Sequence, residues 1–270
     1  MTLSKFFSRE TGLKTLADNS YKAVNEGFYD ADKYDYTSHT VISLKKVILT
    51  CNHVPIISEI KFSSPSKGKI LDQSKINPKD LAIQMTNSGS VGISVLTQPY
   101  LFDGSIHNLA SIRKSVNVPL LMKDIIVSEV QIDAARKIGA DGILLIKTIF
   151  DKGFAEGSLD KFSDYATKKG LEVTTEVHSE DEFKEILKNK NQLIGINNRN
   201  LNTLEVDISV TIELLQKFDK QNNIIISESG ISNSDDIKKL RSIGVDAFLV
   251  GTSIMESENV FEKIKELCHA

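Results

Sequence analysis

The sequence has little of what secreted and membrane proteins need. It contains only two cysteines, Cys51 and Cys268, which are too few for the disulfide framework of a small secreted domain and fit a reducing compartment. The N-terminus has no continuous apolar segment of the signal-peptide kind, and no later apolar run is long enough to cross a bilayer. We therefore expect a cytoplasmic protein with no membrane partner.

An excess of positive charge is also missing. The 33 Lys and Arg residues against 36 Asp and Glu residues give a net charge of -3, without a polybasic run. This balance argues against nucleic acid or an anionic membrane as the main partner. The five histidines are scattered without the spacing of metal ligands, so we expect no metal site.

What is present describes an ordinary globular protein of 270 residues, 40% of them hydrophobic and 26% charged. That length suits two small domains or one α/β barrel. Residues 1–50 are polar and mixed, with helical stretches near Leu3–Ala23 and Ser38–Thr50. We expect them to form an N-terminal helical extension that packs against a barrel of residues 51–270, within a single domain of residues 1–270.

Apolar strands and amphipathic helices alternate after the extension. After an opening strand from Val54, the predicted strands are Val91–Thr97, Val118–Lys123, Gly142–Lys147, Leu171–Val177, Gln192–Asn197, Asn223–Glu228 and Asp246–Gly251. The predicted helices are Asn77–Ser88, Ile106–Val116, Glu129–Ile138, Leu159–Lys169, Glu180–Lys190, Ile208–Phe218, Asp235–Ile243 and Asn259–Cys268. About eight such units predict a closed (β/α)8 barrel of the TIM type. A doubly wound open sheet is the alternative, but no dinucleotide-binding Gly fingerprint follows any strand.

Ionisable and polar residues stand where these strands end. Glu59 and Lys61 lie two residues apart, on one face of the first strand. The later strand ends carry Lys123, Glu176, Asn197 with Arg199, and Glu228. A structural ion pair or network would explain two or three of these groups. Because the strand ends of such a barrel form its active-site face, their convergence favours an acid/base site.

The last two units add a phosphate signal. Ser229-Gly230-Ile231-Ser232 follows the seventh strand and Gly251-Thr252-Ser253 follows the eighth. Barrels of this kind often bind phosphate there with backbone N–H groups and hydroxyls. Ordinary Gly turns with a helix cap are the alternative.

Together these motifs resemble the indole-3-glycerol phosphate synthase family. The matching segments, in the family's order, are Ser58-Glu-Ile-Lys-Phe-Ser-Ser-Pro-Ser-Lys-Gly68, Ser94-Val-Leu-Thr97, Phe102-Asp-Gly104, Leu121-Met-Lys-Asp124, Ile138-Gly-Ala-Asp141, Gly195-Ile-Asn-Asn-Arg-Asn-Leu201, Ser227-Glu-Ser-Gly-Ile-Ser232 and Phe248-Leu-Val-Gly-Thr252. They cover the chain from about residue 50 to its end, and the helical extension before them is also a family feature.

The resemblance implies a carbon–carbon lyase of tryptophan biosynthesis that uses no cofactor. Its substrate would be 1-(2-carboxyphenylamino)-1-deoxyribulose 5-phosphate, whose ring closes with release of carbon dioxide and water. By match to the family's motifs, Lys123 would be the general acid, Lys61 would hold the substrate carboxylate beside Glu59, and Glu176 would be a further acid/base. The other implied site residues are Asn197, Arg199, Glu228 and Ser229 for the sugar, Ser64, Gly230, Gly251 and Thr252 for the phosphate, and Phe102, Ile125, Leu201 and Leu249 as further substrate contacts.

Three positions depart from the family's pattern. Phe62 stands where Arg is usual, Ile125 where Phe is usual, and Thr252 where Ser is common. The first two concern the aromatic subsite and not the reaction. The rival interpretations are another phosphate-binding barrel of tryptophan or histidine biosynthesis, and a non-catalytic metabolite-binding barrel. We expect a monomer, with a weak homodimer as the alternative, and no fused phosphoribosylanthranilate isomerase.

Overall fold

The computed structural model describes residues 12–34, 39–64, 67–70, 76–189 and 192–270. Within these residues eight parallel strands close into one barrel, ordered β1-β10-β9-β8-β7-β6-β5-β4. Their bounds are β1 Ile56–Ile60, β4 Gly92–Leu96, β5 Leu120–Lys123, β6 Gly142–Ile146, β7 Glu172–Val177, β8 Leu193–Asn197, β9 Ile224–Glu228 and β10 Ala247–Val250. The predicted TIM barrel is confirmed, and the open-sheet alternative is wrong.

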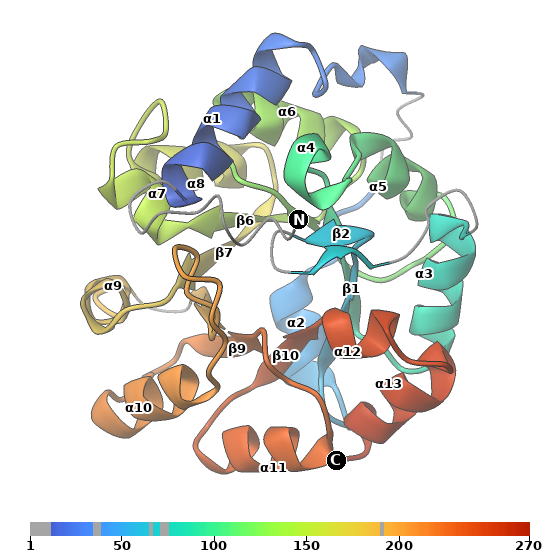
Figure 1. Cartoon of the computed structure of the whole chain (residues 1–270), viewed down its shortest axis with the longest axis vertical. Coiled ribbons are helices and arrows are strands. Elements are labelled where there is room, and N and C mark those ends of the chain that lie inside the picture. The colour runs from blue at the N-terminus through green and yellow to red at the C-terminus, as the bar shows by residue number, and fades with distance from the viewer. Residues whose placement is uncertain (1–11, 35–38, 65–66, 71–75, 190–191) are drawn as a thin grey trace.

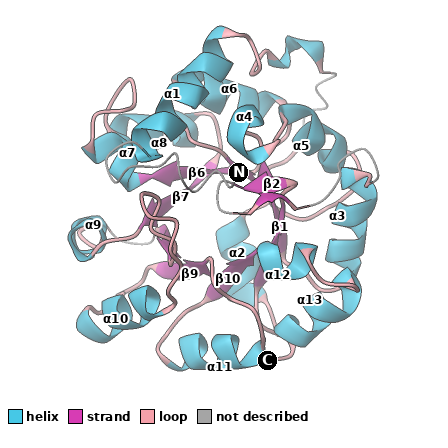
Figure 2. Cartoon of the chain, viewed as in Figure 1, coloured by secondary structure: helices cyan, strands magenta, loops and turns pink. Residues whose placement is uncertain are grey.

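The strands are apolar along most of their length because both of their faces are covered. Figure 2 shows the ring of strands surrounded by helices, and β1, β4, β6, β8 and β9 are buried at every residue. An outer core, with Ile56 and Phe248 among its residues, packs the strands against the helices. An inner core, which includes Ile57, Leu144 and Ile226, lies inside the barrel.

The helices begin and end close to their predicted bounds, because side-chain caps mark most of their first turns. Their bounds are α1 Gly12–Asn25, α2 Leu44–Thr50, α3 Pro78–Asn87, α5 Ile106–Arg113, α6 Glu129–Lys137, α8 Leu159–Lys168, α9 Glu180–Ile186, α10 Ser209–Lys217, α11 Ser234–Ser242 and α13 Val260–Cys268. Three predicted ranges are too long. The predicted helix Ile106–Val116 already ends at Arg113, as α5. The Ser43 side chain accepts a bond from the N–H of Lys46 and starts α2 at Leu44, while α9 already ends at Ile186. The predicted helix positions Leu3 to Thr11, Ser38 and Lys190 lie outside the described residues.

Six short elements in the described residues have no counterpart among the predictions. They are the hairpin strands β2 Ser63–Ser64 and β3 Gly68–Lys69, the helices α4 Pro99–Phe102, α7 Lys147–Asp151 and α12 Thr252–Met255, and the 3-10 helix η2 Ala31–Lys33. Most are one turn or less, so they contain too few residues to show a hydrophobic period. In Figure 1 the hairpin and α12 lie in front of the barrel and α2 lies behind it.

The segment before β1 is attached to both ends of the barrel. At the amino ends of the strands, Glu172 accepts bonds from the Ser43 hydroxyl (2.5 Å) and the Leu44 N–H (2.6 Å). Toward the carboxyl ends, Tyr29 donates to the Asp124 carboxylate at 2.9 Å. The inner core of the barrel continues into α1 through Leu16. The segment before β1 therefore shares the hydrophobic core of the barrel.

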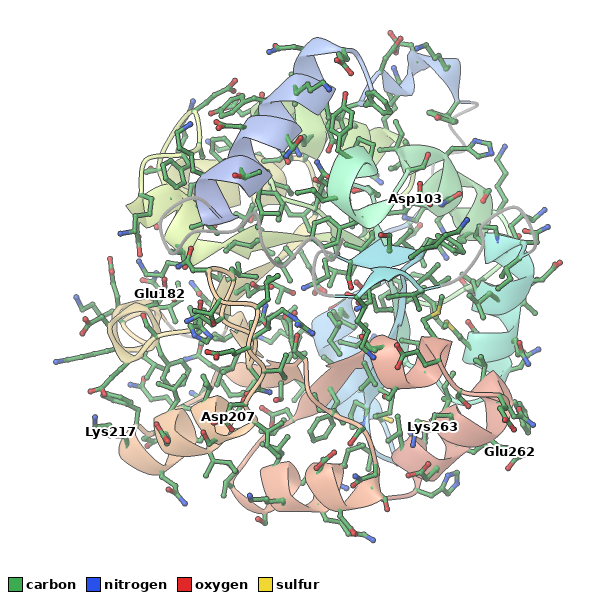
Figure 3. All side chains as sticks on the ribbon, in the orientation of Figure 1. Asp103, Glu182, Asp207, Lys217, Glu262 and Lys263 are labelled. Carbon is green, nitrogen blue, oxygen red and sulfur yellow. The ribbon has the colours of Figure 1, made fainter. Side chains whose placement is uncertain are left out.

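Many charged residues of the outer helices are exposed to solvent. Figure 3 labels Lys217 on α10 and Glu262 on α13, which are exposed and lie at the rim of the molecule. None of the described helices is long and apolar enough to span a bilayer. Across the same part of the chain, no group of three or more His, Cys, Asp or Glu side chains is placed to hold a metal ion.

Candidate active site

A cavity of about 340 Å³ opens at the carboxyl ends of the barrel strands. Every site residue predicted from the sequence lines this cavity: Glu59, Lys61, Ser64, Phe102, Lys123, Ile125, Glu176, Asn197, Arg199, Leu201, Glu228, Ser229, Gly230, Leu249, Gly251 and Thr252. The barrel closes the sheet, so residues from distant parts of the chain meet at one mouth.

The end of β1 supplies a buried ion pair. The Lys61 ammonium lies 2.6 Å from Glu59 Oε1, and both side chains are largely shielded from solvent. Burial by itself would raise the pKa of Glu59, but Lys61, Lys123 and Arg199 outweigh it and hold that pKa below its ordinary value. Glu59 is therefore an ionised carboxylate that faces the cavity.

Lys123, at the end of β5, is the centre of a second cluster. Its ammonium lies 2.6 Å from Glu228 Oε2 on β9 and 3.1 Å from Glu176 Oε2 on β7. Asn197 on β8 fixes the second of these carboxylates, since its Nδ2 donates to Glu176 Oε1 at 2.9 Å. Four strands thus bring one cation, two carboxylates and an amide together.

Lys123 and Glu228 have pKa values that are shifted for different reasons. Burial by itself would lower the pKa of Lys123, but Glu228, Glu176 and Glu59 together raise it well above its ordinary value. Burial is also the largest influence on Glu228 and raises its pKa to about 7; Lys123 opposes this rise, whereas Glu176 and Glu59 add to it. Lys123 therefore carries its proton at neutral pH, and Glu228 changes charge there.

The loop after β8 places a third cation, Arg199, at the mouth. The Arg199 N–H donates to Asn197 Oδ1 at 3.0 Å, and its Nη1 donates to the carbonyl of Leu204 at 3.0 Å. The guanidinium is close enough to Glu59 to influence the pKa of that carboxyl. Asn197 therefore holds Glu176 through its amide nitrogen and the Arg199 backbone through its oxygen.

The loops after β9 and β10 meet beside these clusters. Ser229 and Gly230 both have left-handed backbones, with φ of 65° and 82°, and such a conformation is strained for serine. Thr252 begins α12. At Gly251 a Cβ would lie 2.5 Å from Glu59 Oε1, so the absent side chain makes room for that carboxylate as well as for an anion near the backbone.

One wall of the cavity is apolar. Ile125 follows Lys123 after β5, Phe102 ends α4, and Leu201 and Leu249 complete the predicted apolar set. Ile125 lies with Lys123 at the mouth, as the period of two residues predicts. Phe62 is buried in the outer core instead, as its position one residue out of phase with Lys61 predicts.

Some lining residues escaped the sequence analysis. They include Leu16 on α1, Gln98 at the start of α4, Asp124, and the ion pair of Lys67 with Glu256 (2.5 Å). Asp124 accepts hydrogen bonds from Tyr29 and Thr97, and burial raises its pKa to about 6. Its place beside Lys123 in the Leu-Met-Lys-Asp motif was a usable signal. Leu16 carries none, because only the packing of the extension brings it to the mouth.

Comparison with known proteins identifies one family. Residues 20–267 match the family model described as indole-3-glycerol phosphate synthase. An indole-3-glycerol phosphate synthase of Methanocaldococcus jannaschii is 40% identical over 241 residues, which cover 88% of both chains. One of Aquifex aeolicus is 42% identical over 225 residues, covering 83% of this chain and 84% of the relative.

Solved structures of distant sequence share the fold. A thiamine phosphate pyrophosphorylase from Pyrococcus furiosus superposes with a TM-score of 0.57 and 14% identity, covering 83% of this chain and 96% of that chain. An N-acetylmannosamine-6-phosphate 2-epimerase from Clostridium perfringens gives 0.56 and 14%, covering 81% and 93%. At such low identity these similarities concern the barrel alone.

Proposed function

The chain belongs to the indole-3-glycerol phosphate synthase family, and from this premise we propose which of its residues carry out the reaction. As a member of that family it is a carboxy-lyase of tryptophan biosynthesis that binds a phosphorylated small molecule. It closes the ring of 1-(2-carboxyphenylamino)-1-deoxyribulose 5-phosphate and releases carbon dioxide and water. The observation that carries the proposal is the pair of buried lysine–carboxylate clusters facing one cavity.

We assign the general acid to Lys123. The raised pKa keeps its ammonium protonated at neutral pH, so it can donate to the ribulose carbonyl oxygen while the aromatic carbon attacks the carbonyl carbon. Glu176 and Glu228 hold the ammonium in place before the transfer. Glu176, fixed by Asn197, also stands ready to exchange a proton during dehydration.

Lys61 and Glu59 form the second working pair. The Lys61 ammonium binds the carboxylate that leaves as carbon dioxide, and later helps to expel the hydroxyl group as water. Glu59, kept ionised by its three cationic neighbours, balances the charge of Lys61 and Arg199 and stabilises positive charge on the ring as the bond forms.

The remaining residues divide the cavity by polarity. Asn197, Arg199, Glu228 and Ser229 contact the sugar, and the phosphate binds where Ser64, Gly230, Gly251 and Thr252 meet. Ile125, Phe102, Leu201 and Leu249 form the apolar wall against the anthranilate ring. This division supports the placement of a molecule with an aromatic end and a phosphate end.

Domain organisation, oligomeric state and compartment are part of the same proposal. Residues 1–50 form an extension of one barrel domain, which the bonds of Tyr29 and Ser43 to the barrel support. The protein is a cytoplasmic monomer. The large hydrophobic residues exposed in the described parts are Phe28, Leu49, Ile83, Val130 and Val206. They come from separate elements, whereas a stable interface requires a contiguous apolar patch.

The pH dependence of kcat/KM tests the assignment of Glu228. A carboxyl group is neutral below its pKa and charged above it, and only the charged form of Glu228 attracts the Lys123 ammonium at 2.6 Å. With a pKa of about 7, kcat/KM should rise with pH to a midpoint near 7 and then level off. In Glu228→Gln this limb should disappear, with activity at pH 8 roughly tenfold lower, because the hydrogen bond to a charged group that is weakened contributes about 1.5 kcal/mol.

Glu256→Gln is the matched control, because Glu256 lines the same cavity but pairs with Lys67. It should keep the limb near pH 7. Titration of the substrate phosphate is common to all three proteins and cancels in the comparison. An unchanged limb in Glu228→Gln would assign that titration to another group.

Ile125→Phe tests the apolar wall. Phenylalanine would present an aromatic face to the anthranilate ring, and an aromatic pair contributes about 0.5–1.5 kcal/mol beyond its buried area. We expect KM to fall by several-fold with little change in kcat. This result is typical of a contact that stabilises the bound substrate and the transition state equally. If Ile125 only packs beneath its loop, the larger side chain will leave KM unchanged or raise it and will lower the melting temperature.

A further inference from the structure

The two oxygens of the Glu228 carboxylate have different surroundings. Oε2 contacts the Lys123 ammonium at 2.6 Å, while Oε1 is buried and accepts no hydrogen bond from any described residue. Oε1 lies against the backbone of Gly195 on β8. A Cβ built at Gly195 would be 2.2 Å from Oε1 and 3.2 Å from Cδ of Glu228, and real Cβ atoms are not found that close to another heavy atom.

Strand register explains why these two residues meet. Gly195 is level with Glu176 on one neighbouring strand and with Ile226 on the other. Residues level with one another in parallel strands point to the same face, and the Glu176 side chain points to the cavity. Glu228 is level with Asn197, two residues nearer the mouth, so its side chain bends back over the position that a residue 195 side chain would fill.

The backbone of Gly195 does not itself require glycine. Gly195 is not among the residues with positive φ, so alanine could adopt its conformation. A glycine inside a strand weakens that strand and often marks a close approach of another group. Apart from Glu228, the nearest atom to the missing side chain is Thr174 Cγ2, at an ordinary 3.6 Å. The Glu228 carboxylate is therefore the group that would have to move.

We propose that Gly195 is a positioning residue of the active site, because its missing side chain leaves the space through which the Glu228 carboxylate reaches Lys123. The inference rests on the proposed roles of Glu228 and Lys123 for its catalytic consequence, and on the contact distances alone for its structural one. A methyl group at position 195 displaces the carboxylate, and the Lys123 ammonium loses its nearest anionic partner.

Gly195→Ala is the first variant to measure. We expect kcat to fall at least tenfold with KM changed less than threefold, and the pH limb near 7 to move or disappear. Gly92→Ala is the matched control, since Gly92 is also in a barrel strand but a Cβ there meets nothing nearer than 3.2 Å. It should keep at least half of wild-type kcat. A Gly195→Ala enzyme that keeps more than half of wild-type kcat and the same pH limb overturns the proposal.

A double-mutant cycle of melting temperatures tests the contact without reference to activity. Gly195→Ala should lower the melting temperature strongly in the wild-type background and much less in the Glu228→Ala background, because the colliding carboxylate is then gone. If Gly195→Ala alone does not fold, Gly195→Ala/Glu228→Ala should. Equal losses in the two backgrounds, or a double variant that fails to fold while Glu228→Ala folds, overturn the proposal.

The two readouts also separate the failure of this inference from that of the proposed function. A fully active Glu228→Gln enzyme would refute the catalytic role of Glu228, and the melting cycle would still measure whether Gly195 accommodates its carboxylate. If the active-site variants behave as predicted but the melting-temperature effects of the two substitutions are additive, only the inference about Gly195 is refuted.

Discussion

Lys123→Ala should lower kcat by about 100-fold to 10,000-fold, the range that general acid catalysis contributes. The ammonium lies at the centre of the cluster of Glu176 and Glu228, with both carboxylates within 3.1 Å. Alanine removes the proton donor and leaves these carboxylates buried without their cation. KM should change far less than kcat, because the sugar and phosphate contacts remain.

The same substitution should also affect stability. A buried carboxylate that has lost its cation takes up a proton or pays for desolvation, so the melting temperature of Lys123→Ala should fall by several degrees. Lys220→Ala is the matched control, since Lys220 pairs with Asp246 at 2.6 Å just before β10, at the opposite end of the barrel. It should lose stability and keep kcat within about twofold of wild type. A Lys123→Ala enzyme with more than a tenth of wild-type kcat would refute the assignment of the general acid.

Glu59→Gln should lower kcat by about 100-fold, near the lower end of the range for acid–base and charge-stabilising groups. Glutamine keeps the shape of Glu59 and can still meet Lys61, but it removes the negative charge that Lys61, Lys123 and Arg199 stabilise. The cavity then holds an uncompensated excess of positive charge. Substrate binding should suffer less than turnover, because the substrate is itself an anion.

This variant also decides between the two interpretations of the Glu59–Lys61 pair that the sequence left open. A structural ion pair would lower the melting temperature of Glu59→Gln and leave kcat nearly unchanged. Glu172→Gln is the control for a structural role, since Glu172 accepts hydrogen bonds from Ser43 and Leu44 at the other end of the barrel. It should lower the melting temperature and leave kcat nearly unchanged. If the two variants lose stability alike and both keep kcat, Glu59 has only a structural role.

The barrel could be predicted because each strand is buried on both faces and is therefore a continuous apolar run. The charged ends of those runs, such as Glu176 and Glu228, then indicated the candidate site from the sequence alone. In a closed parallel barrel the carboxyl ends of all strands face one mouth, so positions in sequence translated directly into neighbours in space. The burial of Phe62 followed in the same way from the two-residue period of a strand.

The remaining features depend on tertiary contacts that no local pattern encodes. Leu16 reaches the cavity only because α1 packs across the barrel, and its sequence context is that of any amphipathic helix. The contact of Gly195 with Glu228 depends on strand register and on the direction in which one side chain bends. The position of Gly251 after the last strand predicted a phosphate contact. Its closeness to Glu59 follows only from the pairing of β1 with β10 in the closed barrel.

The most direct test of the account is to mix the purified, chelator-treated protein with 1-(2-carboxyphenylamino)-1-deoxyribulose 5-phosphate and record indole fluorescence and released carbon dioxide together. If the two clusters perform the ring closure unaided, both signals will rise in equal amounts without any added metal or cofactor. The Lys123→Ala protein will produce both at no more than a hundredth of the wild-type rate. No rise in fluorescence with the wild-type protein, or release of carbon dioxide without indole, would contradict the account.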